Sequence, residues 1–499
     1  MHKTIHVETA GTLSAQIAES DKSEIAKLTI TGNLDGADMR CINEMAKNQL
    51  SVLDLSGADI ENNTIEDNDF SGCKSLTNIT IPNTVTSIGK DAFEDCGSLI
   101  DITIPNSITS IGEGAFRRCE SLKSVTIPNS IISIGKLTFQ LCTSLTHITI
   151  PDSVTSIGMY AFRRCHGLKS IIIPNSVAKI GYCAFSNCTR LNDVTIPDSV
   201  TYIGSGAFEY CKSLTHITIP ASVTSISEGT FSDCKSLKSI TIPDSITSIG
   251  KGAFGCCESL TSITIPNSVI SIEEIVFEMC SSLKEIFIQE ENVHYSMIDG
   301  VLFDKDKTIL IRYPIAKPNT SYIIPDSVIN IKKGAFKHCS NLTHITIPDS
   351  VAYIGCQAFL NCESLEEIII TEGNAKFSVV DGVLFDKDKT ILICYPSNKS
   401  SAAYTLPNSI TYIGDSIFSY CNYLTAITIP KAVTSIEKNA FDYCRSLKEI
   451  HNNNPIPQAI TEYYFWCDKE VCTLFVPKGS YSAYKNAEGW GEFKNIIEE

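Results

Sequence analysis

The 499-residue sequence lacks the features that would place it in several common classes of protein. It has no apolar run of the roughly 18 residues or more that a transmembrane helix requires. It also lacks basic residues in excess, because 40 Lys and Arg residues face 56 Asp and Glu residues, for a net charge of −16. Nucleic acids and anionic membranes attract basic surfaces, so neither is expected as a partner.

Signatures of catalysis and of secretion are missing as well. No glycine-rich phosphate loop follows a predicted strand, and no Ser or Cys stands out as a nucleophile with its own base. The start, MHKTIHVETAGTLSAQ, has no apolar region of the kind found in signal peptides. We therefore expect a protein that is not an enzyme and binds no cofactor or metal. It is either cytoplasmic, or at the cell surface or secreted after removal of a signal that preceded Met1.

What the chain does contain is one 23-residue motif, close to L-x-x-I-T-I-P-[ND]-S-V-T-S-I-G-x-x-A-F-x-x-C, repeated along most of its length. Self-similarity at a fixed period of about 20 to 29 residues is typical of a leucine-rich-repeat solenoid. The cysteines of its Phe-x-x-Cys pair are Cys73, Cys96, Cys119, Cys142, Cys165, Cys188, Cys211, Cys234, Cys257, Cys280, Cys339, Cys362, Cys421 and Cys444.

One repeat is enough to predict the shape of a coil. Ile102 and Ile104 alternate with polar residues, which is the pattern of a half-buried strand, and Pro105 ends that strand. A second short extended piece follows, and then Phe116 and Cys119 face inward from a one-turn helical or 3₁₀ segment. We therefore predict a β-rich, right-handed solenoid with a parallel sheet on one face and short helical or 3₁₀ turns on the other edge, capped at both ends.

The repeats also set the predicted domain organisation. Residues 1–57 read as an N-terminal cap, 58–450 as the solenoid and 451–499 as a C-terminal cap, all in one continuous elongated domain. In the N-terminal cap we expect strands at residues 3–7, 28–31 and 52–55 and helices at 12–20 and 37–47. In the C-terminal cap we expect a last strand at 473–477, with Trp490 and Phe493 closing the core. Two repeats are enlarged, at about residues 289–325 and 371–407, and both contain D-G-V-L-F-D-K-D-K-T. This string predicts a β-hairpin. A calcium loop is the alternative for Asp304 and Asp306, but the central Gly and the twelfth-position Glu are missing.

The 21 cysteines do not form the pattern of a disulfide scaffold. Fourteen of them occupy the Phe-x-x-Cys position, where they are expected to pack as small, buried, reduced residues. Cys467 and Cys472 in the C-terminal cap are the pair for which a disulfide stays open.

The predicted sheet presents a row of threonines to solvent, which Ile172, Phe287 and Ile369 interrupt. Beside it lie His147 and His216, which are three coils apart, roughly 14 Å at strand spacing, and therefore too far apart to share a zinc ion. The row is explained either by the β-propensity of Thr and cross-strand pairing, or by a ligand-facing surface, with an ice-binding surface as a third reading. The candidate partner-binding residues are Thr103, Thr126, Thr149, Thr195, Thr218, Thr241, His147 and His216.

Two arginine pairs, Arg117-Arg118 and Arg163-Arg164, lie two coils apart on the helical edge. They are read either as a small basic spot or as solvated surface.

The motif L-x-x-I-T-I-P-x-S-V-T-S-I-G-x-x-A-F-x-x-C resembles the BspA-like leucine-rich repeat over about residues 74 to 450. The resemblance implies a bacterial cell-surface adhesin that binds host extracellular-matrix proteins or other bacteria. We therefore expect a monomeric, non-catalytic binding protein whose outward sheet face recognises a protein or glycan. The alternative is an intracellular protein-interaction scaffold, which the many thiols and the absent signal favour.

Overall fold

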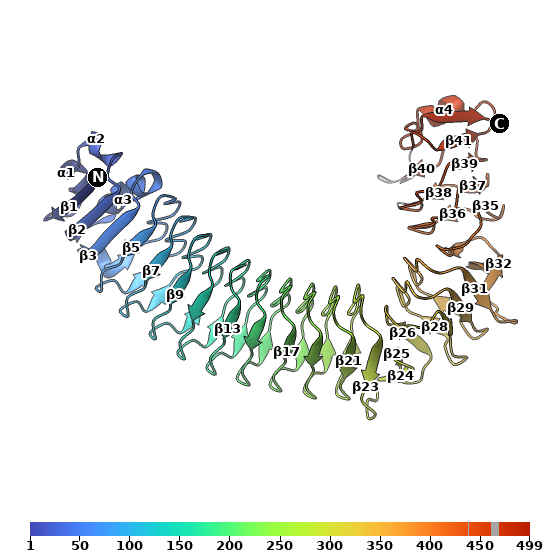
Figure 1. The fold of residues 1–499 in the computed structure, drawn as a ribbon, viewed down its shortest axis with the longest axis horizontal. Helices are drawn as coiled ribbons and strands as arrows, with labels where there is room; N and C mark the ends of the chain where they lie inside the picture. Colours follow the sequence, from blue (N-terminus) through green and yellow to red (C-terminus); the bar gives the residue numbers. More distant parts are fainter. Residues whose placement is uncertain (438, 461–468) are drawn as a thin grey trace. The chain divides into compact units, whose positions relative to one another are not determined.

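The computed structural model describes residues 1–437, 439–460 and 469–499 of the chain. These residues form a parallel β-solenoid, in which each coil adds strands to those of the coil before it (Figure 1). The chain divides into two compact units, Met1–Ser281 and Ser282–Glu499, which are described separately below. The organisation as one continuous domain stays a prediction.

A single coil of the first unit confirms the predicted strands. The first strand of this coil, β7 (Asp101–Thr103), pairs in parallel with β5 (Asn78–Thr80), and Ile102 lies opposite Ile79 in the core. A second strand, β8 (Ser110–Ile111), pairs with β6 (Ser87–Ile88). Gly112 turns the next corner where the coils nearly touch, since a Cβ there would lie 2.5 Å from the carbonyl carbon of Gly89. Each coil therefore contributes to two parallel ladders.

The first ladder of the first unit contains the longer strands. They are β1 (His2–Val7), β2 (Lys27–Leu34), β3 (Val52–Ile60), β5, β7, β9 (Ser124–Thr126), β11 (His147–Thr149), β13 (Ser170–Ile172), β15 (Asp193–Thr195), β17 (His216–Thr218), β19 (Ser239–Thr241) and β21 (Ser262–Ile265). The second ladder contains β4 (Thr64–Ile65), β6, β8, β10 (Ser133–Ile134), β12 (Ser156–Ile157), β14 (Lys179–Ile180), β16 (Tyr202–Ile203), β18 (Ser225–Ile226), β20 (Ser248–Ile249) and β22 (Ser271–Ile272).

The second unit repeats the arrangement, with first-ladder strands of three or four residues. These are β23 (Glu285–Ile288), β27 (Ser321–Ile323), β29 (His344–Ile347), β31 (Glu367–Ile370), β35 (Ala403–Thr405), β37 (Ala426–Ile429), β39 (Glu449–Asn452), β41 (Thr473–Val476) and β42 (Asn495–Glu498). Its second-ladder strands are β26 (Ile309–Arg312), β28 (Asn330–Ile331), β30 (Tyr353–Ile354), β34 (Leu392–Cys394), β36 (Tyr412–Ile413), β38 (Ser435–Ile436) and β40 (Ala459–Ile460).

The segment around each motif phenylalanine, here called the turn column, is not a helix. Single i→i+3 turns form, as from the amide of Cys96 to the carbonyl of Phe93, but they do not propagate. Asp91 and Asp95 have positive φ values of 50° and 58°, which interrupts a right-handed helix. The amide of Phe93 instead donates to Ala115 of the next coil at 2.8 Å. Of the two predicted alternatives, the 3₁₀ type is thus confirmed as single i→i+3 turns. The helix alternative is wrong, because the other amides of the segment bond along the stack.

The core is a set of stacked columns, one for each apolar position of the motif. The phenylalanine rings of neighbouring coils are nearly parallel, as between Phe139 and Phe162 with centroids 5.5 Å apart. The motif cysteines are buried beside them, as predicted, and most of their thiols donate to the phenylalanine carbonyl of the preceding coil, for example Cys165 to Phe139 at 3.1 Å. Ile104, which the alternation of apolar and polar residues predicts to point inward, is buried as expected. Stacking of the coils therefore buries the apolar side chains that a single coil would leave exposed.

The N-terminal cap contains the predicted strands and helix. Helix α3 (Gly36–Asn48) starts with a capping box, in which the Asp35 carboxylate accepts the Ala37 and Asp38 amides. From α3, the Asn43 side-chain amide donates to the carbonyl of Asp69, which lies at the start of the turn column. The helix expected over residues 12–20 is instead two short helices, α1 (Leu13–Gln16) and α2 (Glu19–Lys22), because the buried Ile17 between them is extended.

Both enlarged repeats contain the predicted hairpin and one strand more. In the first, β24 (Tyr295–Ile298), β25 (Val301–Asp304) and β26 form an antiparallel sheet. In the second, β32 (Phe377–Val380), β33 (Val383–Asp386) and β34 do the same. The Asp304 carboxylate accepts the Thr308 hydroxyl at 2.8 Å and the Ile309 amide at 2.7 Å. Asp304 thus serves as a turn residue, in keeping with the hairpin reading.

The C-terminal cap ends with one strand more than predicted. Strand β41 was expected to be last, but β42 pairs with it in parallel after the chain returns through α4 (Tyr481–Lys485). Trp490 and Phe493 are fully buried, as predicted, and the indole Nε1 of Trp490 donates to the Gln458 carbonyl at 3.0 Å. Of the possible disulfide pair, Cys472 is buried, whereas Cys467 lies outside the described residues.

Candidate functional site

The eight candidate residues all lie exposed on the first-ladder strands of the first unit. Thr103, Thr126, Thr149, Thr195, Thr218 and Thr241 are each the third residue of their strand, and His147 and His216 are the first of theirs. Parallel register aligns them: Thr126 lies opposite Thr149, and Thr218 lies opposite Thr241. Repetition of the motif therefore produces continuous rows of side chains on one face of the ladder, which we call the sheet face.

The histidines of the sheet face are held in fixed orientations. The Nδ1 atom of His147 lies 2.9 Å from the Thr146 hydroxyl, and that of His216 lies 3.1 Å from the Thr215 hydroxyl. Both histidines are exposed on this face. This local contact comes directly from the T-H-I-T sequence and presents a polar, oriented group at intervals along the face.

Apolar residues interrupt the threonine row and are strongly exposed. Ile172 and Ile323 are 81% and 72% exposed, and Phe287 and Ile369 lie at corresponding positions. Sequence reasoning found three of these four and missed Ile323, although Pro325 two residues later marks its place in the motif. Exposed side chains of this kind, set among polar ones, give the face the mixed character of protein-binding surfaces.

The two arginine pairs differ in their surroundings. Arg117 forms ion pairs with Asp91 and Glu94, and Arg118 lies 3.3 Å from Asp95. The Arg163 guanidinium instead lies over the Tyr160 ring, 5.2 Å from its centroid. The first pair is therefore locally neutralised, whereas the second combines a cation with an aromatic surface.

The motif thiols are poor candidates for nucleophiles. Burial raises the pKa of the Cys165 thiol well above its usual range, and it raises that of Cys188 to about 12. A thiol is reactive as the thiolate, and that form is suppressed in an apolar core at neutral pH. These cysteines consequently serve as packing residues.

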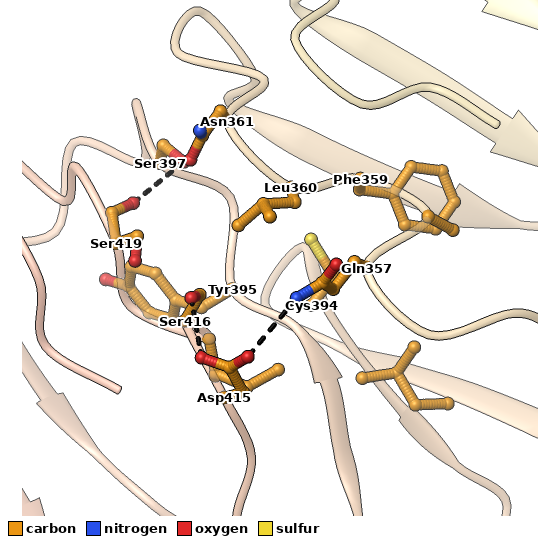
Figure 2. Close-up of a pocket in the computed structure, with 13 residues that line it drawn as sticks. Gln357, Phe359, Leu360, Asn361, Cys394, Tyr395, Ser397, Asp415, Ser416 and Ser419 are labelled. Carbon is orange, nitrogen blue, oxygen red and sulfur yellow. Dashed lines mark hydrogen bonds between the residues drawn. The ribbon is translucent and has the colours of Figure 1, made fainter. Parts of the chain in front are cut away.

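A small cavity of about 50 Å³ marks the point where the second enlarged repeat interrupts the turn column (Figure 2). The Asp415 carboxylate closes one side of it, accepting the Gln357 side-chain amide at 3.2 Å and the Ser416 hydroxyl at 2.8 Å. The Ser397 hydroxyl donates to the Ser419 carbonyl at 3.3 Å. This volume suits one or two water molecules. The cavity is too small for an organic substrate.

Within the described ranges, no group of three or more His, Cys, Asp or Glu side chains is arranged to hold a metal ion. Over those same residues, none of the helices combines the length and the apolar character needed to cross a membrane.

A family model described as BspA type leucine rich repeat region matches the chain in six overlapping copies, at residues 51–169, 132–232, 156–284, 201–309, 316–390 and 393–487. Among solved structures, a leucine rich cell surface protein from Faecalibacterium prausnitzii A2-165 is similar at 31% identity. The match covers 79% of this chain and 83% of that one, with a TM-score of 0.48. A leucine-rich repeat protein from Bacteroides ovatus is similar at 28% identity, covering 79% and 88%, with a TM-score of 0.47. Comparison with curated proteins gave no significant match.

Proposed function

This chain belongs to the BspA type leucine-rich-repeat family, and from that premise we propose that it is a cell-surface adhesin that binds a macromolecule through its sheet face. Leucine-rich-repeat proteins are generally non-catalytic and act by binding other proteins. The finer proposal is that the partner is a host extracellular-matrix protein or a surface glycan, bound by a monomer.

The observation that carries the proposal is the register of the sheet face. Thr126, His147, Thr149 and Thr195 are exposed on β9, β11 and β15. Strand β9 pairs with β11, and β15 pairs with the intervening β13, so equivalent residues continue along the ladder. A partner that contacts several coils at once binds with higher affinity, because many contacts over a large area add together even though each contact is weak. No side chain of these rows is needed by the core, so the rows are free to serve recognition.

The test replaces Thr126, His147, Thr149 and Thr195 together with Lys and measures binding to purified extracellular-matrix proteins by surface plasmon resonance. We expect binding to fall at least tenfold while the thermal midpoint changes little. A matched control carries Lys at four exposed positions, each directly before a second-ladder strand: Thr109, Thr155, Thr201 and Thr224. This control should bind normally. If both variants bind alike, the sheet face is not the binding surface.

An intracellular scaffold is the second candidate, and the many buried thiols favour it, because reduced cysteines persist in the cytosol. Surface labelling of intact cells separates the two proposals. Labelled protein supports the adhesin, whereas protein reached only after lysis supports the scaffold.

A further inference from the structure

The second enlarged repeat forms a recess of about 470 Å³ within the second unit. Its walls come from five separate stretches of chain. They include His344 and Glu367 from the first-ladder strands β29 and β31, Lys399 from the end of the enlarged repeat and Tyr423 from the next coil. The volume falls in the range of about 300 to 1,000 Å³ that is usual for small-ligand sites. The recess is thus large enough to hold a ligand, unlike the cavity of about 50 Å³ at Gln357.

Hydrogen bonds and ion pairs hold the polar walls of this recess in place. The Lys399 ammonium lies 3.0 Å from Asp381, and the Lys399 side chain is only 10% exposed. The Asn398 side-chain amide donates to Glu366 at 3.4 Å, while the Asn398 backbone amide donates to Leu365 at 2.8 Å. These contacts orient donors and acceptors before any ligand arrives, which lowers the entropic cost of binding.

The His344 ring is also placed by its neighbours. Its Nδ1 atom lies 2.8 Å from the Thr343 hydroxyl, and its Nε2 atom lies 3.9 Å from a Glu367 carboxylate oxygen. Glu367 is therefore shared between the recess and the outward row of the second unit. A ligand in the recess would consequently be continuous with a partner lying along that row.

The chemistry of the lining fits a sugar. Carboxylates of Glu366, Glu367 and Asp381 accept hydrogen bonds, and Asn398 and Lys399 donate them, as a set of neighbouring hydroxyls requires. Tyr423, which is 53% exposed, offers an aromatic face for the C–H side of a pyranose ring. We infer that this recess binds a neutral saccharide unit, carried by a glycoprotein or by a polysaccharide.

A charged ligand fits the recess less well than a neutral one. Lys399, the one Lys in the lining, is already paired with Asp381, so an anion would meet the carboxylates without a free cation to balance it. A basic peptide is the competing occupant. However, Glu366 and Glu367 already lie close to the Asn398 amide and the His344 ring, so they suit shared hydrogen bonds better than a full cation.

The chain contains its own control for this site. In the first enlarged repeat, Lys317 and Asp299 form an ion pair at 3.0 Å that is equivalent to the pair between Lys399 and Asp381 in the second. The lining differs in sequence, because Lys284, Ala316 and Asn341 stand at the positions of Glu366, Asn398 and Tyr423. The Glu366 carboxylate, the Asn398 side-chain amide and the Tyr423 ring are thus found only in the second of the two enlarged repeats.

The experiment screens the full chain against an array of neutral mono- to tetrasaccharides and measures the best binder by calorimetry. Glu366→Lys and Tyr423→Asn each install the residue of the first enlarged repeat, and each should weaken binding at least tenfold. Lys284→Ala, in the first enlarged repeat, is the matched control and should bind as the native chain does. Unchanged circular dichroism shows that the variants fold.

Three results would overturn the inference: no saccharide binds, binding survives both recess variants, or the recess variants lose only the binding of a hexa-arginine peptide. The inference rests on the proposed function, in that the saccharide belongs to the macromolecule bound along the sheet face. The variant with four Lys substitutions on the sheet face distinguishes failure of the recess inference from failure of the proposed function. Loss of matrix binding with no saccharide binding rejects the recess alone, whereas saccharide binding with unaltered matrix binding in that variant rejects the sheet face alone. Enzymatic deglycosylation of the partner then distinguishes a glycoprotein source from a polysaccharide.

Discussion

Raising the pH should unfold the first unit through its column of buried thiols. Burial raises the pKa of seven of these thiols well above their usual range; they belong to Cys119, Cys142, Cys165, Cys188, Cys211, Cys234 and Cys257. In the unfolded chain a Cys titrates near 8.5. Above that pH the folded state holds protons that the unfolded state releases. The stabilisation is therefore complete below about pH 8.5 and is lost as the pH rises toward the folded pKa, about 12 for Cys188.

The size of the expected loss of unfolding free energy follows from the number of buried thiols. Between pH 8.5 and 9.5 each thiol with a strongly raised pKa costs about 1 kcal/mol of unfolding free energy, so seven cost about 7 kcal/mol. Native proteins are stable by only about 5 to 15 kcal/mol. A fall of this size should therefore bring alkaline unfolding into an accessible pH range.

The assay is urea unfolding followed by circular dichroism, at pH 7.5, 8.5 and 9.5, with a phosphine reductant to prevent oxidation. The midpoint should already fall from pH 7.5 to 8.5, by the equivalent of about 2 to 3 kcal/mol, and fall about three times as far from 8.5 to 9.5. Cys188→Ala should reduce the pH-dependent loss by about 1 kcal/mol, the share of one thiol. An unfolding free energy that is the same at pH 8.5 and 9.5 would refute the reasoning, because it would mean that the thiols are not buried together.

Three further perturbations follow from the packing. Ile104→Ala should cost about 2 to 5 kcal/mol, with hydrogen exchange accelerated mainly in adjacent coils; equal acceleration along the first unit would argue against local coupling. Trp490→Ala should cost about 3 to 5 kcal/mol and speed exchange in residues 439–460, and an unaltered exchange profile would show that the cap is dispensable. Asp304→Ala removes two turn acceptors and should cost about 1 to 3 kcal/mol in urea titrations, whereas added calcium should not stabilise the native chain.

Much of the fold could be predicted because each repeat has the same pattern of apolar, polar and turn residues. Phe116, Cys119 and Ile104 lie inside as the motif requires, and the D-K-D-K turn forms its hairpin through Asp304. These features depend on local alternation and turn chemistry, which one repeat contains in full.

Features that depend on contacts between coils could not be predicted. The turn column looked helical from Phe93 and Cys96, yet its amides bond to the following coil, and no local pattern signals that choice. Strands β24 and β42 form only when their partners are in place. The recess escaped notice for the same reason, since Glu366 and Tyr423 meet in space from different coils.

The most direct test of the central claim is side-chain footprinting by hydroxyl radicals, with and without a bound matrix protein. His147 and His216 report on the sheet face. Met159 and Tyr182, each more than 40% exposed, report on the turn edge of the coil that contains His147 and of the coil after it. Binding through the sheet face predicts that oxidation of both histidines falls while oxidation of Met159 and Tyr182 is unchanged. Protection of Met159 and Tyr182 with both histidines still reactive would contradict the account and move the binding surface to the turn edge.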